Sequence, residues 1–226
     1  MPTSGLIRRT FKAMADNQLD LLLNADGLAP KDALAKIADD ASDCTSCRHH
    51  RSRKQIVFGD GPIDAKIILL GEAPGRNEDK TGLPFTGKSG DLLMKILARV
   101  NLKRTDLYIC NVLKCRPKDN EEPGMTALKA CRRYLTQQLM IVHPKVIIAA
   151  GNWALKGLFL ESFAGIMKEQ GVERDYNGII VLPSLHPAFL LRSEGSPNEK
   201  EYKDKTLAIW KRAVEIAYPE KVKWNV

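Results

Sequence analysis

The chain has 226 residues, of which 44% are apolar and 27% are charged, and its net charge at pH 7 is +8. This length suits one domain with or without an appendage, and the apolar fraction excludes a disordered chain. No apolar run approaches the roughly 20 residues of a membrane span, and no secretory apolar segment begins the chain. We therefore expect a soluble, monomeric, cytoplasmic protein. The excess of basic residues permits a polyanionic partner without demonstrating one.

The N-terminal part of the chain has helical spacing. Residues 1–41 are predicted to form two amphipathic helices that are interrupted around "NADGLAP", with Pro30 placed to start the second helix. Residues 42–62 are polar and contain cysteines, and a regular alternation of strands and helices begins only after them. We therefore divide the chain into a helical extension, residues 1–41, to which no role is assigned, and one domain, residues 42–226.

Short apolar runs in the rest of the chain are typical of buried strands, at residues 65–71, 106–113, 145–151 and 178–187. Segments with helical spacing lie between and after these runs, at residues 89–100, 124–143, 152–159 and 200–218. Runs that are apolar throughout are typical of parallel strands that are covered on both faces. The sequence therefore predicts a three-layer α/β/α fold with a central, mainly parallel, four-stranded sheet and an N-terminal helical extension.

Residues suited to binding a ligand follow the first, second and fourth predicted strands: Glu72, Phe85, Asn111 and His186. Each alone has an ordinary structural explanation, as a cap, a core ring, a strand-end amide or a turn residue. Together they fall at the carboxyl edge of one sheet, where α/β proteins bind their ligands. The first of these loops is rich in glycine and could cradle a phosphate, but it lacks both standard nucleotide-binding motifs.

Four of the five cysteines are spaced as candidate metal ligands. Cys44 and Cys47 form a C-x-x-C pair, whereas Cys115 and Cys131 are separated by 15 residues. Cys110 lies in a predicted strand, as a small buried apolar side chain would. A disulfide framework is not expected inside a cell, which leaves zinc, an iron–sulfur cluster or unligated thiols. Because zinc sites with four cysteines usually have two short knuckles, the wide second spacing favours a [4Fe–4S] cluster.

Three ordered segments, "GEAPGRNEDKTGLPFTGKSG", "CNVLKCRP" and "LHPAFLLR", together with these four cysteines, resemble the family 4 uracil-DNA glycosylases, the iron–sulfur branch of their superfamily. The resemblance covers about residues 42–216. It implies a DNA repair glycosylase that flips uracil out of DNA and hydrolyses its N-glycosidic bond, leaving an abasic site. It also implies a [4Fe–4S] cluster on Cys44, Cys47, Cys115 and Cys131, and uracil-containing DNA as the partner.

The resemblance assigns a role to each candidate residue. Asn111 reads the edge of uracil, His186 stabilises the departing uracil anion, and Glu72 positions the attacking water. Phe85 stacks on the flipped base. The full set of substrate-binding candidates is Gly71, Glu72, Ala73, Gly75, Phe85, Asn111 and His186. The candidates for contacts with DNA are Lys88, Ser89 and Arg192.

The first segment departs from the better-known family 1 enzymes, which carry an aspartate where Ala73 stands and a tyrosine where Gly75 stands. Family 4 shares the first of these departures. The sequence therefore leaves open how water is activated and how thymine is excluded. After Glu72, the next candidates for positioning water are Glu78 and Asp79.

Other functions are also compatible with parts of the sequence. A non-catalytic or covalently trapping relative would bind uracil-DNA tightly, but the trapping enzymes carry a basic, histidine-containing insertion after the first segment, and none is present here. An iron–sulfur interaction domain attached to replication machinery would not need the complete set of pocket residues. A small-molecule enzyme on a flavodoxin-like sheet is the third alternative.

Overall fold

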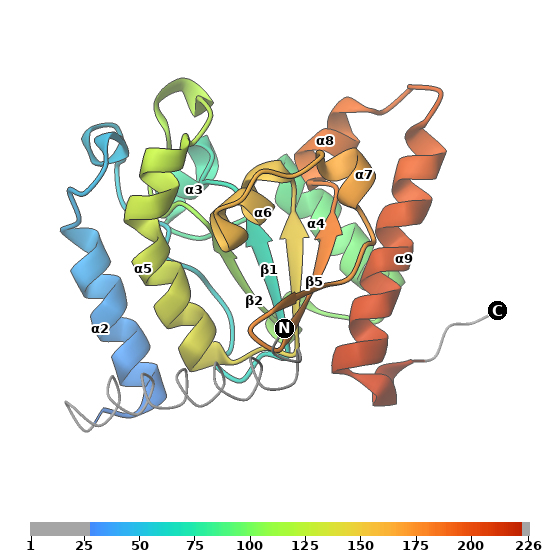
Figure 1. The fold of residues 1–226 in the computed structure, drawn as a ribbon, viewed down its shortest axis with the longest axis horizontal. Coiled ribbons are helices and arrows are strands. Elements are labelled where there is room, and N and C mark those ends of the chain that lie inside the picture. The colour runs from blue at the N-terminus through green and yellow to red at the C-terminus, as the bar shows by residue number, and fades with distance from the viewer. Residues whose placement is uncertain (1–27, 223–226) are drawn as a thin grey trace, which may run out of the picture.

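The structure, a computed structural model, describes residues 28–222 (Figure 1). Its centre is a five-stranded sheet in the order β2-β1-β3-β5-β4. Strands β1, β2, β3 and β5 are parallel, and β4 pairs antiparallel with β5. The strand bounds are β1 Ile67–Gly71, β2 Leu107–Asn111, β3 Val146–Ala150, β4 Arg174–Tyr176 and β5 Ile179–Ser184.

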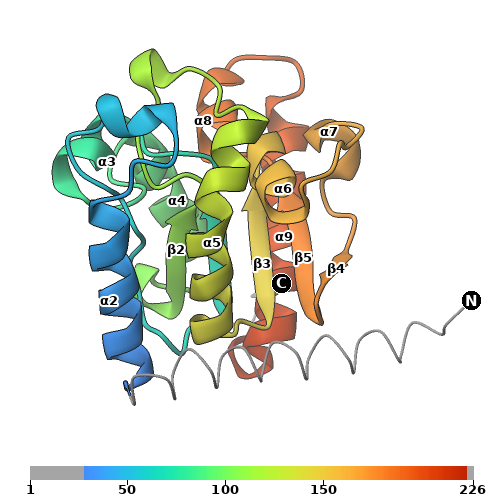
Figure 2. The ribbon, with the colours of Figure 1, turned by 60° about the vertical axis from the view of Figure 1, so that its left-hand side comes forward.

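Helices cover both faces of the sheet, so the predicted three-layer α/β/α arrangement is confirmed (Figures 1 and 2). Alternate strand residues enter two separate cores: Ile68 and Leu70 pack with α2, α5 and α6, whereas Ile67 and Leu69 pack with α4 and α9. The α-helix bounds are α2 Pro30–Ser42, α3 Arg76–Thr81, α4 Lys88–Arg99, α5 Met125–Val142, α6 Asn152–Phe159, α7 Ile166–Glu169, α8 Pro187–Arg192 and α9 Glu199–Ala217. Short 3₁₀ turns are η1 Arg48–Arg51, η2 Arg104–Asp106, η3 Lys118–Asn120 and η4 Pro219–Lys221.

The prediction of four strands is wrong by one, because β4 was not foreseen. This strand has three residues, and none of them is fully buried. It is joined to β5 by Asn177 and Gly178, whose φ angles of 55° and 87° are both positive. Positive φ at both central residues is the signature of a tight hairpin turn, and Asn-Gly is the sequence that favours it. The Asn-Gly dipeptide could have predicted the hairpin turn, but the polar sequence of β4 gave no sign of a strand.

The second of the two predicted N-terminal helices is confirmed as α2, which begins at Pro30. The first lies outside the described residues. In Figures 1 and 2, α2 runs beside α5, and its buried face is formed by Ala33, Ile37 and Ala41. These residues join the core that also contains α5. Helix α2 therefore packs directly on the domain, and it ends two residues before Cys44.

The order of the strands places a topological switch point at the carboxyl edge of the sheet. Strand β1 lies between β2 and β3, so the chain first crosses over from β1 to β2 on one side and then returns from β2 to β3 on the other side of β1. Ligands of open α/β sheets bind at such a switch point, outside the carboxyl ends of the strands. Among the described residues, no helix is both long enough and apolar enough to cross a membrane.

Helix α6 depends on a glycine where it crosses the chain that follows β2. A Cβ atom on Gly157 would lie 2.6 Å from Val112 Cγ1 and 2.7 Å from Val112 Cβ. In an unpacked helix, alanine would be more stable than glycine by up to about 1 kcal/mol. Here we expect overpacking to reverse the sign, so that Gly157→Ala lowers the free energy of unfolding by about 1–3 kcal/mol in a denaturant titration.

The matched control is the same substitution in a Val112→Ala background, which removes both methyl groups of Val112 and leaves only the contact with its Cβ atom. The cost of Gly157→Ala should shrink there, because the two sites share one contact. An equal cost in both backgrounds would contradict the packing explanation.

Candidate active site and cysteine cavity

The predicted site residues from β1 and β2 lie next to each other at the carboxyl edge. Gly71 ends β1 and pairs in register with Asn111, the last residue of β2. A Cβ atom on Gly71 would lie 2.3 Å from Asn111 Oδ1 and 2.9 Å from Phe85 Cε2. No side chain fits between them, so the absence of one on Gly71 lets the amide of Asn111 and the ring of Phe85 lie close together.

The aromatic ring of Phe85 and the imidazole of His186 stack next to each other at this edge of the sheet. Phe85 lies between α3 and α4, and only 7% of it is exposed. The centroids of the two rings are 5.5 Å apart, with an angle of 29° between the ring planes. The structure therefore brings together four predicted residues from three loops: Gly71, Phe85, Asn111 and His186.

His186 is held in one protonation state. It caps the N-terminus of α8, where its Nδ1 accepts a hydrogen bond from the Ala188 N–H at 3.0 Å. Burial, together with the positive charge of Arg192, lowers the pKa of His186 from 6.5 to about 4. The imidazole is therefore neutral near pH 7. Because Nδ1 accepts, the proton of the neutral ring is on Nε2, which is left as a donor.

The side-chain amide of Asn111 is buried, with 2% of the residue exposed. No other residue in the range 28–222 hydrogen-bonds to this amide, so both its carbonyl and its NH₂ group are available to a ligand. Its backbone carbonyl accepts a hydrogen bond from Lys114 Nζ at 2.8 Å. The backbone of Asn111 is fixed while its side chain keeps one acceptor and one donor for recognition.

Glu72 follows Gly71 and is half-buried. Burial raises the pKa of Glu72, and the negative charge of Glu122 adds to this effect, while Arg192 opposes it. Arg192, at the end of α8, is exposed and lies near enough to influence both Glu72 and His186. A carboxylate whose pKa is raised holds a proton more readily than an ordinary glutamate does.

The remaining candidates occupy different environments. Ala73 packs against the core, and Gly75 caps α3. Lys88 and Ser89 lie in the first turn of α4, which presents backbone N–H groups toward the edge of the sheet. Glu78 and Asp79, the two further candidates for positioning water, both form hydrogen bonds to backbone N–H groups. Asp79 is buried and accepts a hydrogen bond from Lys54 N–H at 2.9 Å, and Glu78 binds the backbone after Phe85.

Four cysteines line one small cavity. Cys44 and Cys47 follow α2, Cys115 follows β2, and Cys131 lies in α5. The fifth, Cys110, lies within β2 and is fully buried in the core, as predicted. No group of three or more histidine, cysteine or acidic side chains within residues 28–222 is arranged around a single metal ion.

Positive charges surround this cavity, which fits a negatively charged, thiolate-bound group. Arg53 Nη1 lies 3.2 Å from Cys115 Sγ, and Arg133 Nη2 lies 3.7 Å from Cys44 Sγ. Although burial alone would raise it, hydrogen bonds to Cys44 lower the pKa of its thiol to about 7. Lys114 also lines the cavity and is buried. The donor set and its charges are suited to an iron–sulfur cluster.

Several of these residues escaped the sequence analysis. Lys114, Gln138 and Arg53 form the polar surroundings of the cysteines and of β2, but nothing in their local sequence distinguishes them from surface residues. Gln138 lies in α5, where its Nε2 donates to the Phe58 carbonyl at 2.8 Å and its Oε1 accepts from Lys114. The position of Lys114 directly before Cys115 was the only available signal.

Comparison with known proteins identifies the family. Residues 58–211 match the family model described as the uracil DNA glycosylase superfamily. A type-4 uracil-DNA glycosylase of Thermotoga maritima is 39% identical over 71% of this chain and 84% of its own length. Proteins of the same description from Sulfurisphaera tokodaii and Archaeoglobus fulgidus are each 38% identical over 71% of this chain, and over 76% and 84% of their own lengths. This chain belongs to the type-4 uracil-DNA glycosylase family.

Proposed function

We propose that this protein excises uracil from DNA by hydrolysing the N-glycosidic bond of a uracil nucleotide that has been flipped out of the helix. The product is an abasic site and free uracil. The observation that carries this proposal is the meeting of Phe85, Asn111 and His186 around Gly71, in a member of the type-4 family. An excision assay on uracil-containing oligonucleotides, with thymine as the control base, tests it directly.

Recognition of the base rests on Asn111 and Phe85. Uracil presents N3–H as a donor and O4 as an acceptor. The Asn111 carbonyl accepts from N3–H while its NH₂ group donates to O4. Cytosine reverses this pattern and leaves the buried amide unpaired, which is costly. The ring of Phe85 supplies the flat apolar surface against which the flipped base stacks.

Departure of the base rests on His186. As the bond to the sugar breaks, positive charge develops on the sugar and negative charge on uracil. The neutral imidazole donates from Nε2–H to uracil O2, where the negative charge collects. The hydrogen bond from Ala188 N–H to Nδ1 keeps the ring in this orientation and tautomer. Because the donor is fixed before the reaction, no reorganisation opposes the developing charge.

The attacking water is assigned to Glu72. This carboxylate stands beside the pocket, and its raised pKa favours accepting a proton from water as the water attacks the sugar. Its negative charge also stabilises the positively charged sugar. The hydrogen bonds of Glu78 and Asp79 to backbone groups make them less suitable for this role.

Binding of the DNA backbone is assigned to Lys88, Ser89 and Arg192. The first turn of α4 offers free backbone N–H groups and the positive end of the helix dipole to a phosphate. Arg192 is exposed at the mouth of the pocket. The net charge of +8 supports a general attraction to the polyanion.

The [4Fe–4S] cluster is assigned to Cys44, Cys47, Cys115 and Cys131. The hydrolysis transfers no electrons, so the cluster serves as a structural crosslink. It would join the segment after α2, the loop after β2 and helix α5. Cys115 lies four residues after Asn111, so the crosslink would fix the loop that follows the base-reading amide.

The first test of base recognition is Asn111→Asp, which keeps the shape of the side chain and removes its donor. The carboxylate would face uracil O4 and oppose the anionic leaving group. We expect single-turnover excision of uracil to fall by at least about 10²-fold, equivalent to roughly 3 kcal/mol of lost polar pairing. Weak excision of cytosine is also expected, because the carboxylate accepts from its exocyclic amine.

Asn198→Asp is the matched control, since it adds the same charge at an exposed position at the start of α9. Both variants are compared after their melting temperatures are shown to match that of the wild type. Wild-type uracil excision by folded Asn111→Asp protein would reduce Asn111 to a strand-end structural amide.

The protonation state of His186 gives a second prediction. With a pKa of about 4, against 6.5 in the unfolded chain, the folded protein binds fewer protons between these values. This residue therefore makes folding less stable as pH falls from about 6.5 to about 4, and excision should show no histidine step near pH 6.5. His186→Ala should slow excision by about 10²–10³-fold across neutral pH.

His186→Gln separates donation from charge, because its amide donates a hydrogen bond and does not titrate. It should retain more activity than His186→Ala. A wild-type rate that rises as pH falls through 6.5 would instead indicate a cationic histidine as the active form.

The third prediction concerns the cysteines. Purified protein should be brown, with broad absorption near ~400 nm from the iron–sulfur chromophore. Cys115→Ala should lose this absorption and lower the melting temperature. Cys110→Ala is the control, because Cys110 lies in β2 outside the cavity, and it should keep the colour. A colourless wild type with one tightly bound zinc ion would contradict the assignment.

A further inference from the structure

The backbone at Phe85 is strained. Its φ angle is 53°, in the left-handed region that bulky residues avoid. The next helix presses on the same peptide, because a Cβ atom on Gly90 would lie 2.0 Å from the Phe85 carbonyl oxygen. Strained residues persist only where their surroundings hold them, and they concentrate at functional sites. The contacts of this segment show what holds it.

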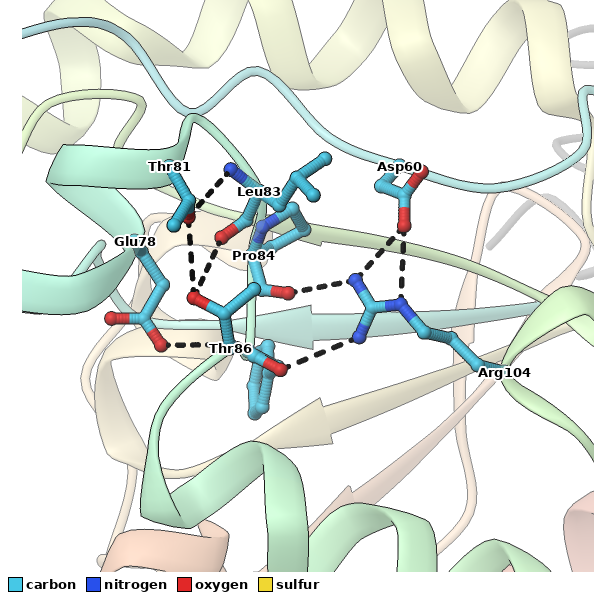
Figure 3. Close-up of polar contacts among 8 residues, drawn as sticks. Asp60, Glu78, Thr81, Leu83, Pro84, Thr86 and Arg104 are labelled. Carbon is cyan, nitrogen blue, oxygen red and sulfur yellow. Dashed lines mark hydrogen bonds and ion pairs between the residues drawn. The ribbon is translucent and has the colours of Figure 1, made fainter.

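Arg104 holds the carbonyl side of the segment (Figure 3). Its Nη2 donates to the Pro84 carbonyl at 2.8 Å, and its Nη1 points to the Phe85 carbonyl at 3.4 Å. The other edge of the guanidinium binds Asp60, with Nε 3.1 Å and Nη2 2.9 Å from the same carboxylate oxygen. The Asp60 carboxylate therefore fixes the planar guanidinium of Arg104, and the guanidinium in turn orients two successive backbone carbonyls.

Glu78 holds the amide side of the same segment. Its Oε1 accepts from Thr86 N–H at 3.0 Å (Figure 3) and also from Gly87 N–H at 3.2 Å. Thr81 adds a contact between its hydroxyl and that of Thr86 at 3.3 Å. The backbone around Phe85 is thus held on both sides. The Arg104 cation binds the carbonyls of Pro84 and Phe85, and the Glu78 carboxylate binds the amides of Thr86 and Gly87.

The residues that hold the carbonyl side of the Phe85 segment are connected to β2, the strand that carries Asn111. Asp60 N–H donates to the Ile109 carbonyl at 2.9 Å, and Ile109 N–H donates to the Asp60 carbonyl at 2.7 Å. Arg104 lies in η2, which directly precedes β2. Asp60 is therefore joined to β2 two residues before Asn111, and Arg104 lies just before the start of the same strand. A shift of β2 would move the support of Phe85 with it.

We propose that Arg104 and Asp60, with Glu78 opposite them, are positioning residues that set the plane of Phe85 relative to Asn111. The proposal rests on the proposed function, in which uracil stacks on Phe85 while Asn111 reads its edge. Both contacts must be made by one rigid base, so the angle and distance between ring and amide are constrained together. A misplacement of about 1 Å in such a site can reduce the rate about 10²-fold.

Stability alone does not explain this arrangement. The side chains of Arg104 and Asp60 are 27% and 38% exposed. Partly exposed ion pairs of this kind contribute little to the free energy of unfolding. A positioning role therefore predicts a loss of rate without a matching loss of stability, whereas a purely structural role predicts the opposite.

The test is a double-mutant cycle of Arg104→Met and Phe85→Ala, read by single-turnover excision of uracil from duplex DNA. Arg104→Met alone should slow excision at least about tenfold, with the melting temperature and equilibrium DNA binding close to those of the wild type. In the Phe85→Ala background the same substitution should slow excision less than about threefold, because the effects of two residues that act as a unit are not additive. Arg104→Lys, which keeps the charge without the fork, should fall between Arg104→Met and the wild type.

Arg212→Met is the matched control, because Arg212 on α9 pairs with Glu215 of the same helix and with Glu173 directly before β4, away from the Phe85 segment. It should leave excision unchanged. If Arg104→Met does not fold, Asp60→Asn and Arg104→Lys enter the same cycle. An Arg104 effect of equal size in both backgrounds, or none at all, overturns the positioning role while leaving Phe85 as the stacking residue. Normal excision by Phe85→Ala overturns the stacking role and the positioning role together.

Discussion

The ammonium group of Lys114 is buried inside the protein, with 1% of the residue exposed. It donates to the Asn111 carbonyl and to Gln138 Oε1, and it lies 5.6 Å from the centre of the Phe58 ring. No carboxylate within residues 28–222 forms an ion pair with it. Burial lowers the pKa of Lys114, while the thiols of Cys110 and Cys131 oppose that change. A buried cation without a carboxylate is costly unless another negative group is near. Thiolates that ligate the proposed cluster would supply that charge, and the cavity and the end of β2 would then form one electrostatic unit.

This link explains why an amide and a thiol share the short stretch "CNVLKCRP". Asn111, whose side-chain amide has no partner among residues 28–222, lies at the carboxyl edge, and Cys115 lines the cavity formed with Cys44, Cys47 and Cys131. Lys114 hydrogen-bonds to the backbone carbonyl of Asn111 and also lines that cavity. In the proposed function the site works with preorganised groups: this amide and a histidine whose pKa is lowered by burial and by Arg192. Neither would need to change its protonation state to receive the base.

The sequence predicted the parts of the fold that rest on long apolar patterns. The four parallel strands, α5, α6 and α9 were all visible from periodicity, because each buries a continuous row of side chains. It also predicted that Phe85, Asn111 and His186 meet, since parallel strands bring their carboxyl ends to one edge. It did not predict β4, α3, α7 or α8, which are too short to show a period. The contacts of Lys114, Gln138 and Arg104 were also missed, because partners separated by 20 or more residues leave no local pattern.

The contacts of Arg104, Asp60 and Lys114 all converge on strand β2, and the position of this strand in the sheet explains why. It is an edge strand, with β1 on one side only. Its free edge is covered by the chain before β1: Asp60 pairs with Ile109, and Val57 N–H donates to the Lys114 carbonyl at 2.8 Å. Covering an edge prevents pairing with other chains. Here the covering segment also carries Asp60, whose side chain holds Arg104 against the Phe85 segment. An edge strand can move more easily than a central one. Strand β2, whose Asn111 is proposed to read the base, is held by Arg104 and Asp60 at its approach and by the hydrogen bond from Lys114 to the Asn111 carbonyl at its end. The proposed cluster, bound through Cys115, would strengthen that hold just beyond the strand.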